Sequence, residues 1–210
     1  MSDKNIFDEI KSFEKSDYEN NKVNLHIHTI CSDGKAEISD IVNQAKEKNY
    51  KKIAVTDHNT FDAHKNFQDD ILIPAIEFDV WAGYVFCHIL GYGINIKNEE
   101  LQNFCAKSKR ETECDMVRIF SKRDIKKLFN AIHNAGGIVV LAHPACCWAL
   151  NLEKFVKKLI SFGLDGLEVY YPYKRHRGII KFHKVKTVEK LADKYNLLKT
   201  GGTDLHDKWL

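Results

Sequence analysis

The chain has 210 residues, 44% of them hydrophobic and 29% charged, and its 32 Lys and Arg residues nearly balance its 29 Asp and Glu residues. This composition excludes a highly charged disordered chain and a polybasic tail as the main functional device. The length suits one compact domain with a sizeable core. The longest apolar runs, such as residues 138–142, are too short to cross a bilayer, and no apolar stretch of the secretory type follows the N-terminus. We therefore expect a cytoplasmic protein with no membrane partner.

The six cysteines are expected to be reduced thiols. No C-x-x-C pair occurs, and the adjacent pair Cys146 and Cys147 has poor geometry for a mutual disulfide. An even cysteine count indicates a disulfide framework only in short secreted chains.

The chain divides into a leading segment and a larger domain. Residues 1–22 are rich in charge, and apolar residues recur at helical spacing between Ile6 and Phe13. This pattern predicts an amphipathic N-terminal helix. Residues 23–210 are expected to form the domain that carries the function.

Apolar runs and helical patterns alternate along that larger domain. Helical periodicity predicts helices over residues 37–49, 121–135, 152–160 and 188–195. Seven short apolar runs predict buried strands over residues 23–28, 52–56, 71–78, 85–90, 138–142, 166–169 and 197–200.

This alternation predicts an α/β fold. Strands separated by helices imply βα units with parallel pairing, and continuous apolar strands imply burial on both faces. Seven such units favour a barrel one unit short of the eight-stranded TIM version, and an open doubly wound sheet is the alternative. The dinucleotide-binding form of that alternative is disfavoured because no G-x-G-x-x-G follows the first strand. Residues 93–137 form a short insertion plus a helix, and their polar part, residues 97–120, has no assigned role.

Histidines and carboxylates gather where the predicted strands end, which is where parallel barrels carry their functional groups. His26 and His28 close the first strand at i, i+2 spacing, so both imidazoles point to the same side. Asp204 and His206 repeat this spacing after the last strand. Ordinary core histidines with polar partners, the alternative reading, would not favour strand ends. The remaining candidates are Asp33, His58, Glu77, His88 and His143.

These residue types indicate a metal centre. Imidazole and carboxylate ligands together suit zinc, iron or manganese. Six histidines and three carboxylates exceed the needs of one ion, so they could supply two or three divalent ions. Neighbouring ions can generate a hydroxide nucleophile at neutral pH and clamp a phosphoryl group. A phosphate ester gains most from this arrangement, because charge on its oxygens is stabilised electrostatically.

The order of these motifs resembles that of the polymerase and histidinol phosphatase (PHP) family of metal-dependent phosphoesterases, over residues 23–207. The resemblance implies a distorted seven-stranded (β/α) barrel with a trinuclear metal site at the C-terminal ends of its strands. It also implies a metal-bound hydroxide as the nucleophile. The motifs are His26-Ile27-His28, Ser32-Asp33-Gly34, Thr56-Asp57-His58, Glu77, His88, Ala142-His143-Pro144 and Asp204-Leu205-His206.

The resemblance further implies how the ligands divide among three ions, with one glutamate bridging two of them. The three sets are His26, His28, Glu77 and Asp204; Glu77, His88 and His143; and Asp33, His58 and His206.

A basic run follows the sixth predicted strand, on the side of the barrel that carries the ligands. Lys174, Arg175 and His176 are the candidate substrate-binding residues there, because Lys and Arg bind phosphate by point charge and by a bidentate fork. The alternative is a solvated basic loop. The modest net charge favours a small phosphorylated substrate, a nucleotide or a short oligonucleotide end over long nucleic acid.

The expected function is therefore hydrolysis of a small phosphate monoester or a terminal nucleotide. A metal-dependent amidohydrolase is one alternative, because such enzymes also begin with H-x-H on a barrel strand. Those chains usually need eight units and lack the ending seen at Asp204 and His206. A non-catalytic metal-binding or accessory module is the other alternative. Ligand losses are typical of such modules, whereas all nine positions here carry ligating residues.

Overall fold

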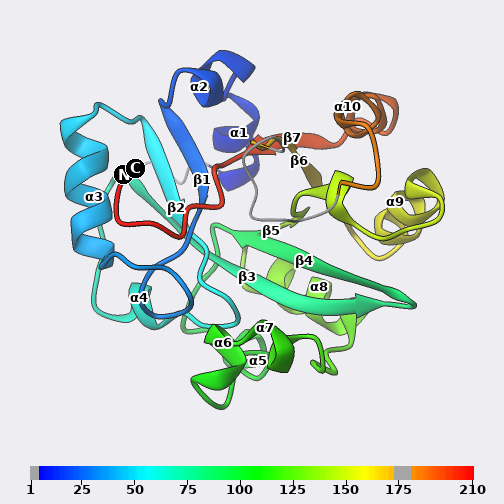
Figure 1. Ribbon diagram of the computed structural model, residues 1–210, viewed down its shortest axis with the longest axis horizontal. Coiled ribbons are helices and arrows are strands. Elements are labelled where there is room, and N and C mark those ends of the chain that lie inside the picture. The colour runs from blue at the N-terminus through cyan, green and yellow to red at the C-terminus, as the bar shows by residue number, and fades with distance from the viewer. Residues whose placement is uncertain (1–4, 173–180) are drawn as a thin grey trace.

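A computed structural model describes residues 5–172 and 181–210, and its strands form one seven-stranded sheet in chain order (Figure 1). Each predicted strand is present, with its ends shifted by a few residues. The strands are β1 (Val23–Ile27), β2 (Lys52–Val55), β3 (Leu72–Ala82), β4 (Val85–Tyr92), β5 (Ile138–Leu141), β6 (Gly166–Tyr170) and β7 (Leu198–Gly201).

The leading segment forms two short helices where one amphipathic helix was expected. Glu14 starts the second helix through a capping box, in which its backbone N–H donates to Asp17 at 3.0 Å. No helix in the described ranges is long and apolar enough to cross a membrane. The helices are α1 (Ile6–Lys11), α2 (Lys15–Glu19), α3 (Ile38–Glu47), α4 (Asp62–Lys65), α5 (Glu99–Gln102), α6 (Arg110–Glu113), α7 (Asp115–Arg118), α8 (Ile125–Asn134), the 3-10 helix η1 (Pro144–Cys146), α9 (Leu152–Ile160) and α10 (Val185–Lys194).

Strand pairing is mixed, so the expectation of parallel pairing throughout is wrong. β1, β2 and β3 are parallel, as are β5, β6 and β7, but β4 is antiparallel to both of its neighbours. A tight turn through Gly83, with φ 76°, joins β3 directly to β4 and leaves no room for a crossover helix. The two strands make a long β3–β4 ribbon whose tip projects from the sheet (Figure 1).

The two edges of the sheet meet irregularly. The chain after β7 bridges in parallel to β1 through Ile27 and Leu205, and the His28 N–H donates to the Leu205 carbonyl at 2.8 Å. The α/β class and the distorted, TIM-like barrel character expected from the sequence are thus confirmed.

Helices cover the outside of the sheet. In Figure 1, α3 lies against β1 and β2 on one flank, and α9 and α10 lie beside β5 to β7 on the other. Helix α8 begins at Asp124, whose side chain accepts from the N–H groups of Lys126 and Lys127. The sequence pattern placed this start at Ser121, but the Ser121 hydroxyl donates to the Asp79 carbonyl at 2.8 Å. The six cysteines are free thiols, as expected.

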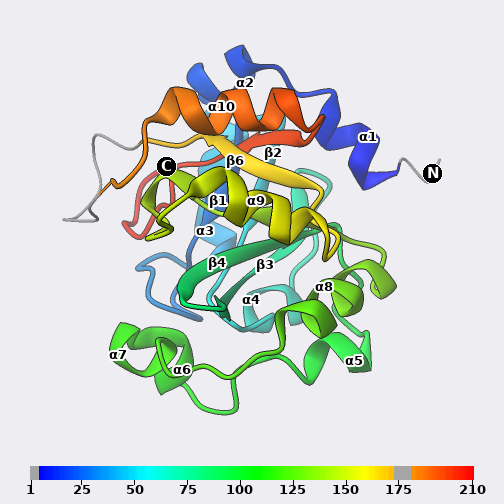
Figure 2. The same ribbon diagram turned by 90° about the vertical axis from the view of Figure 1, so that its right-hand side faces the viewer.

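The inside of the sheet is apolar at one end and polar at the other. Buried residues from β1 to β5, including Leu25 and Tyr92, fill the apolar end, and the Tyr92 hydroxyl donates to the Leu25 carbonyl at 2.9 Å. On β3 the face that carries buried Ala75 continues with Glu77 and Asp79. The apolar end therefore forms a floor beneath a buried polar cluster. Figure 2 shows α6 and α7 side by side below the β3–β4 ribbon.

Candidate metal centre

Glu77 lies at the centre of the polar cluster and is 1% exposed. Its Oε1 atom lies 3.1 Å from His88 Nδ1 and 3.5 Å from His143 Nε2. Its Oε2 atom lies 3.2–3.4 Å from the Nε2 atoms of three further histidines, namely His26, His28 and His58. One carboxylate from the middle of β3 therefore contacts imidazoles from four other segments of the chain.

Two aspartates complete the cluster. Asp204 Oδ1 lies 3.1 Å from His28 Nε2 and 3.4 Å from His26 Nε2. Asp33 Oδ1 lies 3.1 Å from His206 Nε2 and 3.6 Å from His28 Nδ1. The structure thus brings all nine predicted ligand residues together at one end of the sheet.

The ligand atoms form three overlapping groups, within each of which they lie no more than 4.8 Å apart. One group coincides with the set that the family resemblance implies for the first ion. The other two differ from that division, because His28 joins the Asp33 group and His58 stands beside Glu77 and His88, where His143 was expected. The groups are His26, His28, Glu77 and Asp204; His28, Asp33, His58 and His206; and His58, Glu77 and His88.

This spacing fits divalent ions. Two atoms that are each about 2.1 Å from one ion lie at most about 4.2 Å apart. The contacts around Glu77, Asp204 and Asp33, at 3.1–3.6 Å, satisfy this limit. His28 Nε2 is buried and makes no well-directed hydrogen bond within the described residues. A buried polar atom without such a partner is costly, and ligation would supply the partner.

Two glycines let the ligand-bearing loops approach β1. A Cβ atom at Gly34 would lie 2.3 Å from the His28 carbonyl oxygen, and one at Gly202 would lie 2.4 Å from His26 Cβ. Neither distance is tolerated without movement of the backbone. Glycine at these positions allows the two aspartate-bearing loops to reach the histidine pair of β1.

Backbone strain marks two of the candidate ligands. His143 has φ 28° and Asp204 has φ 49°, in the left-handed region that residues other than glycine rarely adopt. The His143 N–H donates to Glu168 Oε2 at 2.8 Å, which helps to hold the strained turn. Strain of this kind persists where the surrounding structure enforces it, commonly at functional sites.

Sequence reasoning missed Asp79, which is fully buried on β3. Its Oδ1 atom lies 3.2 Å from His88 Nε2 and 3.4 Å from His58 Nδ1, on the outer side of both rings. It follows Glu77 at the same i, i+2 spacing that identifies the first histidine pair, so the signal was present.

Glu168 and Tyr171 orient two candidate ligands by contacting the atom of each that points away from the cluster. Glu168 Oε1 lies 2.9 Å from His26 Nδ1, which leaves the Nε2 atom of that ring directed at Glu77. The Tyr171 hydroxyl donates to Asp204 Oδ2 at 2.8 Å, which leaves the Oδ1 atom facing the histidines. Outer carboxylates and hydroxyls of this kind fix the orientation of metal ligands.

Arg118 brings the segment of residues 97–120 into the site. This side chain comes from α7 and is 6% exposed. Its Nη1 atom donates to Asp33 Oδ2 at 3.0 Å and to the Thr112 carbonyl at 2.9 Å, and its Nε atom lies 3.7 Å from Asp79 Oδ1. No sequence pattern indicated this role, because α7 is a single turn within a polar stretch.

We expect Arg118→Met to weaken metal binding at the Asp33 group by about 10- to 100-fold, because an outer partner of a ligating carboxylate is lost. Elemental analysis after dialysis against graded Mn²⁺ measures the ions retained per chain. Arg123→Met is the matched control, since Arg123 comes from the same insertion and donates to the backbone carbonyls of Phe104 and Asp79. Equal metal retention in both variants and the parent protein would contradict this role.

Opposing charges set the protonation of the cluster. Burial alone would lower the pKa of His28, but the carboxylates of Asp204 and Glu77, which lie 3.1 and 3.3 Å from its Nε2 atom, raise it to about 10. Burial would likewise raise the pKa of Glu77, but the surrounding imidazoles hold it well below its usual range. The pKa values of His26 and His88 are raised like that of His28, so protons on these three rings offset the carboxylates, and a cation that binds to them must displace protons.

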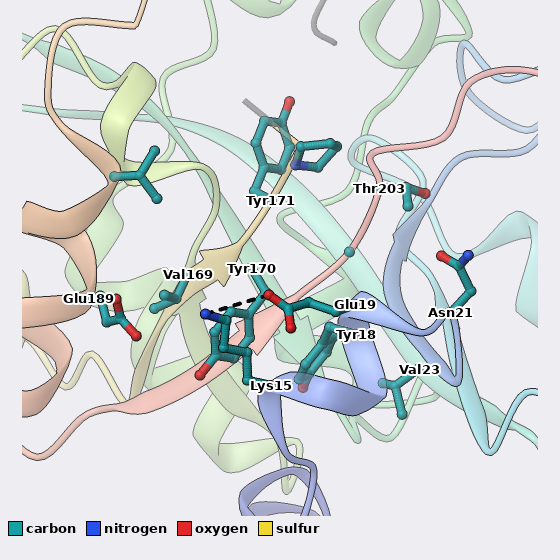
Figure 3. Close-up of a pocket in the computed structure, with 13 residues that line it drawn as sticks. Lys15, Tyr18, Glu19, Asn21, Val23, Val169, Tyr170, Tyr171, Glu189 and Thr203 are labelled. Carbon is teal, nitrogen blue, oxygen red and sulfur yellow. Dashed lines mark ion pairs between the residues drawn. The ribbon is translucent and has the colours of Figure 1, made fainter. Parts of the chain in front are cut away.

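A separate pocket of about 500 Å³ lies between α2, β6 and α10 (Figure 3). Lys15 and Glu19 pair at 3.5 Å across its edge, and Tyr170 lies along its wall. The described residues that line it include none of the nine candidate ligands. The candidate ligands therefore lie outside this pocket. The predicted substrate-binding residues Lys174, Arg175 and His176 lie outside the described residues.

Known proteins share this sequence pattern and fold. A family model described as PHP domain matches residues 24–188. The 5'-3' exoribonuclease Rnm of Salmonella typhimurium (strain LT2) is 26% identical over 205 residues, which cover 89% of this chain and 68% of that protein.

Solved structures extend the similarity to the fold. An amidohydrolase from Chromobacterium violaceum has a TM-score of 0.67 at 16% identity, with 89% of this chain and 88% of that chain covered. A candidate metal-dependent phosphoesterase from Bifidobacterium adolescentis has a TM-score of 0.66 at 20% identity, with 88% and 87% covered. At these identities the likeness shows a shared fold.

Proposed function

The chain belongs to the PHP family, whose model matches most of its length, and we propose that it is a metal-dependent phosphoesterase acting on a terminal nucleotide or a small phosphate monoester. The observation that carries this proposal is the convergence of six imidazoles and three carboxylates, Glu77 among them, at one end of the sheet. A relative named as an exoribonuclease supports phosphate-ester chemistry, since such an enzyme cleaves bonds to phosphorus.

The nine converging side chains would hold two or three divalent ions of manganese, zinc or iron. Ions bound there would supply positive charge for the phosphoryl oxygens and make water acidic enough to attack near neutral pH. The protein's own residues aim the ligands. Glu168 holds the far nitrogen of His26, Tyr171 holds the far oxygen of Asp204, and Arg118 holds one oxygen of Asp33.

The substrate is proposed to approach from the open end of the sheet. The basic residues Lys174, Arg175 and His176, which follow β6 in the sequence, are the proposed contacts to its phosphate. A terminal phosphate reaches a buried cluster more easily than one inside a long strand. An end-acting or small-molecule phosphoesterase therefore suits this site best.

The test is a substrate panel with the Mn²⁺-loaded protein. We expect it to hydrolyse p-nitrophenyl phosphate and at least one of histidinol phosphate, a nucleoside 3',5'-bisphosphate and a 5'-phosphorylated oligoribonucleotide. Asp204→Ala is expected to lose most of this activity, because that carboxylate contacts both histidines of β1.

An N-acylated amino acid completes the panel, because one structural neighbour is named as an amidohydrolase. Hydrolysis of that amide with no phosphate ester cleaved would replace the proposal by the amidohydrolase alternative. Metal binding without hydrolysis of any member would favour a non-catalytic module.

A further inference from the structure

The polar face of the β3–β4 ribbon continues beyond the metal cluster as an aromatic surface. Side chains alternate along a strand, so Glu77, Asp79 and Trp81 share one face of β3. The antiparallel register pairs Asp79 with His88 and Trp81 with Phe86, which places both aromatic residues on that same face. No break in register interrupts the ribbon between Ala75 and its tip.

The aromatic pair lies one step from the cluster toward the ribbon tip. Residues two apart on a strand are separated by about 6.8 Å. The Phe86 ring lies 5.4 Å from the His88 ring and meets it edge-on, and the Trp81 ring lies 5.3 Å from Phe86 with a tilt of 52°. The rings thus form a continuous path from a candidate metal ligand to the surface.

Trp81 is held in an accessible position. Its side chain is 37% exposed, and its Nε1 atom donates to the Ile119 carbonyl at 2.7 Å. Ile119 follows Arg118, which itself reaches into the metal cluster. The insertion therefore holds an exposed indole beside the cluster, and a ligand that binds to the indole costs it little further side-chain entropy.

We propose that Trp81 and Phe86 form a stacking platform for the base of a nucleotide whose phosphate occupies the metal cluster. This inference rests on the proposed phosphoesterase function and narrows its substrates to nucleotides and oligonucleotide ends. In a nucleotide, one sugar separates the phosphate from the base. On the ribbon, a spacing of two residues, about 6.8 Å, likewise separates the cluster from the aromatic rings. Stacking on aromatic side chains tolerates any base, because every base has a flat π-face.

The test compares matched substrates that differ in the base. One pair is adenosine 5'-phosphate and ribose 5-phosphate. The other is a 5'-phosphorylated oligoribonucleotide with either adenosine or an abasic residue at its end. We expect Trp81→Leu to raise KM for the base-bearing member about 5- to 150-fold, the range of one stacking interaction, and to leave the base-free member unchanged. Trp81→Phe should retain most of the preference, because it keeps an aromatic ring.

Trp148→Leu is the matched control. Trp148 is 72% exposed and stacks on Phe182 at 5.8 Å, so it belongs to a different aromatic pair. Its replacement should leave the preference for a base intact. Calorimetric binding of adenosine 5'-phosphate to the Mn²⁺-loaded protein gives a second readout that needs no turnover, and Trp81→Leu should weaken it by the same factor.

Three results would overturn the platform. The first is a parent protein with the same KM for base-bearing and base-free substrates. The second is a Trp81→Leu variant whose KM rises equally for both members of a pair. The third is a Trp148→Leu variant that loses the preference for a base as fully as Trp81→Leu does. A parent protein that binds adenosine 5'-phosphate through Trp81 but hydrolyses no phosphate ester would support the platform and overturn the proposed enzymatic function.

Discussion

Glu77→Gln should lower kcat for p-nitrophenyl phosphate by roughly 10³-fold while leaving the fold intact. Loss of a single preorganised electrostatic contact costs about 10²- to 10³-fold in kcat, and Glu77 contributes to two of the three ligand groups. Glutamine keeps the shape of the side chain but removes the negative charge that faces five imidazoles. Activity is measured together with bound metal, because the variant should also retain fewer ions.

The matched control for this variant is Glu153→Gln. Glu153 is a surface carboxylate that pairs with Lys194 at 2.6 Å on the outside of the sheet. Its neutralisation should leave kcat and metal content unchanged, since exposed pairs contribute little. Full activity and full metal content in Glu77→Gln would contradict the central role assigned to this carboxylate.

Removal of metal should abolish hydrolysis and lower the melting temperature by about 5–10 °C. An ion present at 100 times its dissociation constant stabilises the folded state by about 2.7 kcal/mol. Each kcal/mol shifts the melting temperature of a domain of this size by about 2–4 °C. Secondary structure should persist, because the apolar floor around Leu25 and Tyr92 packs independently of the cluster. Exhaustive dialysis against a chelator, followed by circular dichroism, activity assays and Mn²⁺ addition, measures both effects.

Rebinding of Mn²⁺ to the metal-free protein should release protons, and the affinity for Mn²⁺ should rise with pH. The pKa of His28 is raised to about 10 by Asp204 and Glu77, so below that pH a proton competes with the cation. Affinity is expected to rise roughly tenfold per pH unit for each proton displaced, until the solution pH reaches that value. Calorimetry in buffers with different heats of ionisation counts the protons. Metal-free protein that keeps its activity, or ions that bind without proton release, would contradict a metal centre built on these histidines.

Strand positions were predictable, whereas strand directions were not. Each of the seven strands is an apolar run, and such a run has the same pattern in a parallel and in an antiparallel pair. The direction of β4 depended on the length of the connection before it. Only six residues separate the predicted strands 71–78 and 85–90, too few for a crossover helix. Attention to that length would have predicted the hairpin.

The convergence of the candidate ligands followed from two local rules, alternation along a strand and the clustering of functional groups at strand ends. His26, His28 and Glu77 obey these rules, and the Nε2 atoms of both histidines lie within 3.3 Å of Glu77 Oε2. Arg118 obeys neither rule. It reaches the site because the chain just after α7 is hydrogen-bonded to β3, through the Trp81 indole and the Asp79 carbonyl, and such contacts join distant parts of the chain. Which histidine joins which ligand group also depends on three-dimensional packing, since His58 stands where the family resemblance places His143.

The pairing of Leu205 with the first strand has a consequence for biosynthesis. Because Asp204 and His206 follow the seventh strand, a growing chain can dock every earlier strand and still lack two members of the ligand cluster. Translation that stops early would yield an inert product. Loading with ions, and with it any hydrolytic hazard to the cell's own nucleotides, would wait until the segment after the seventh strand has docked on the first.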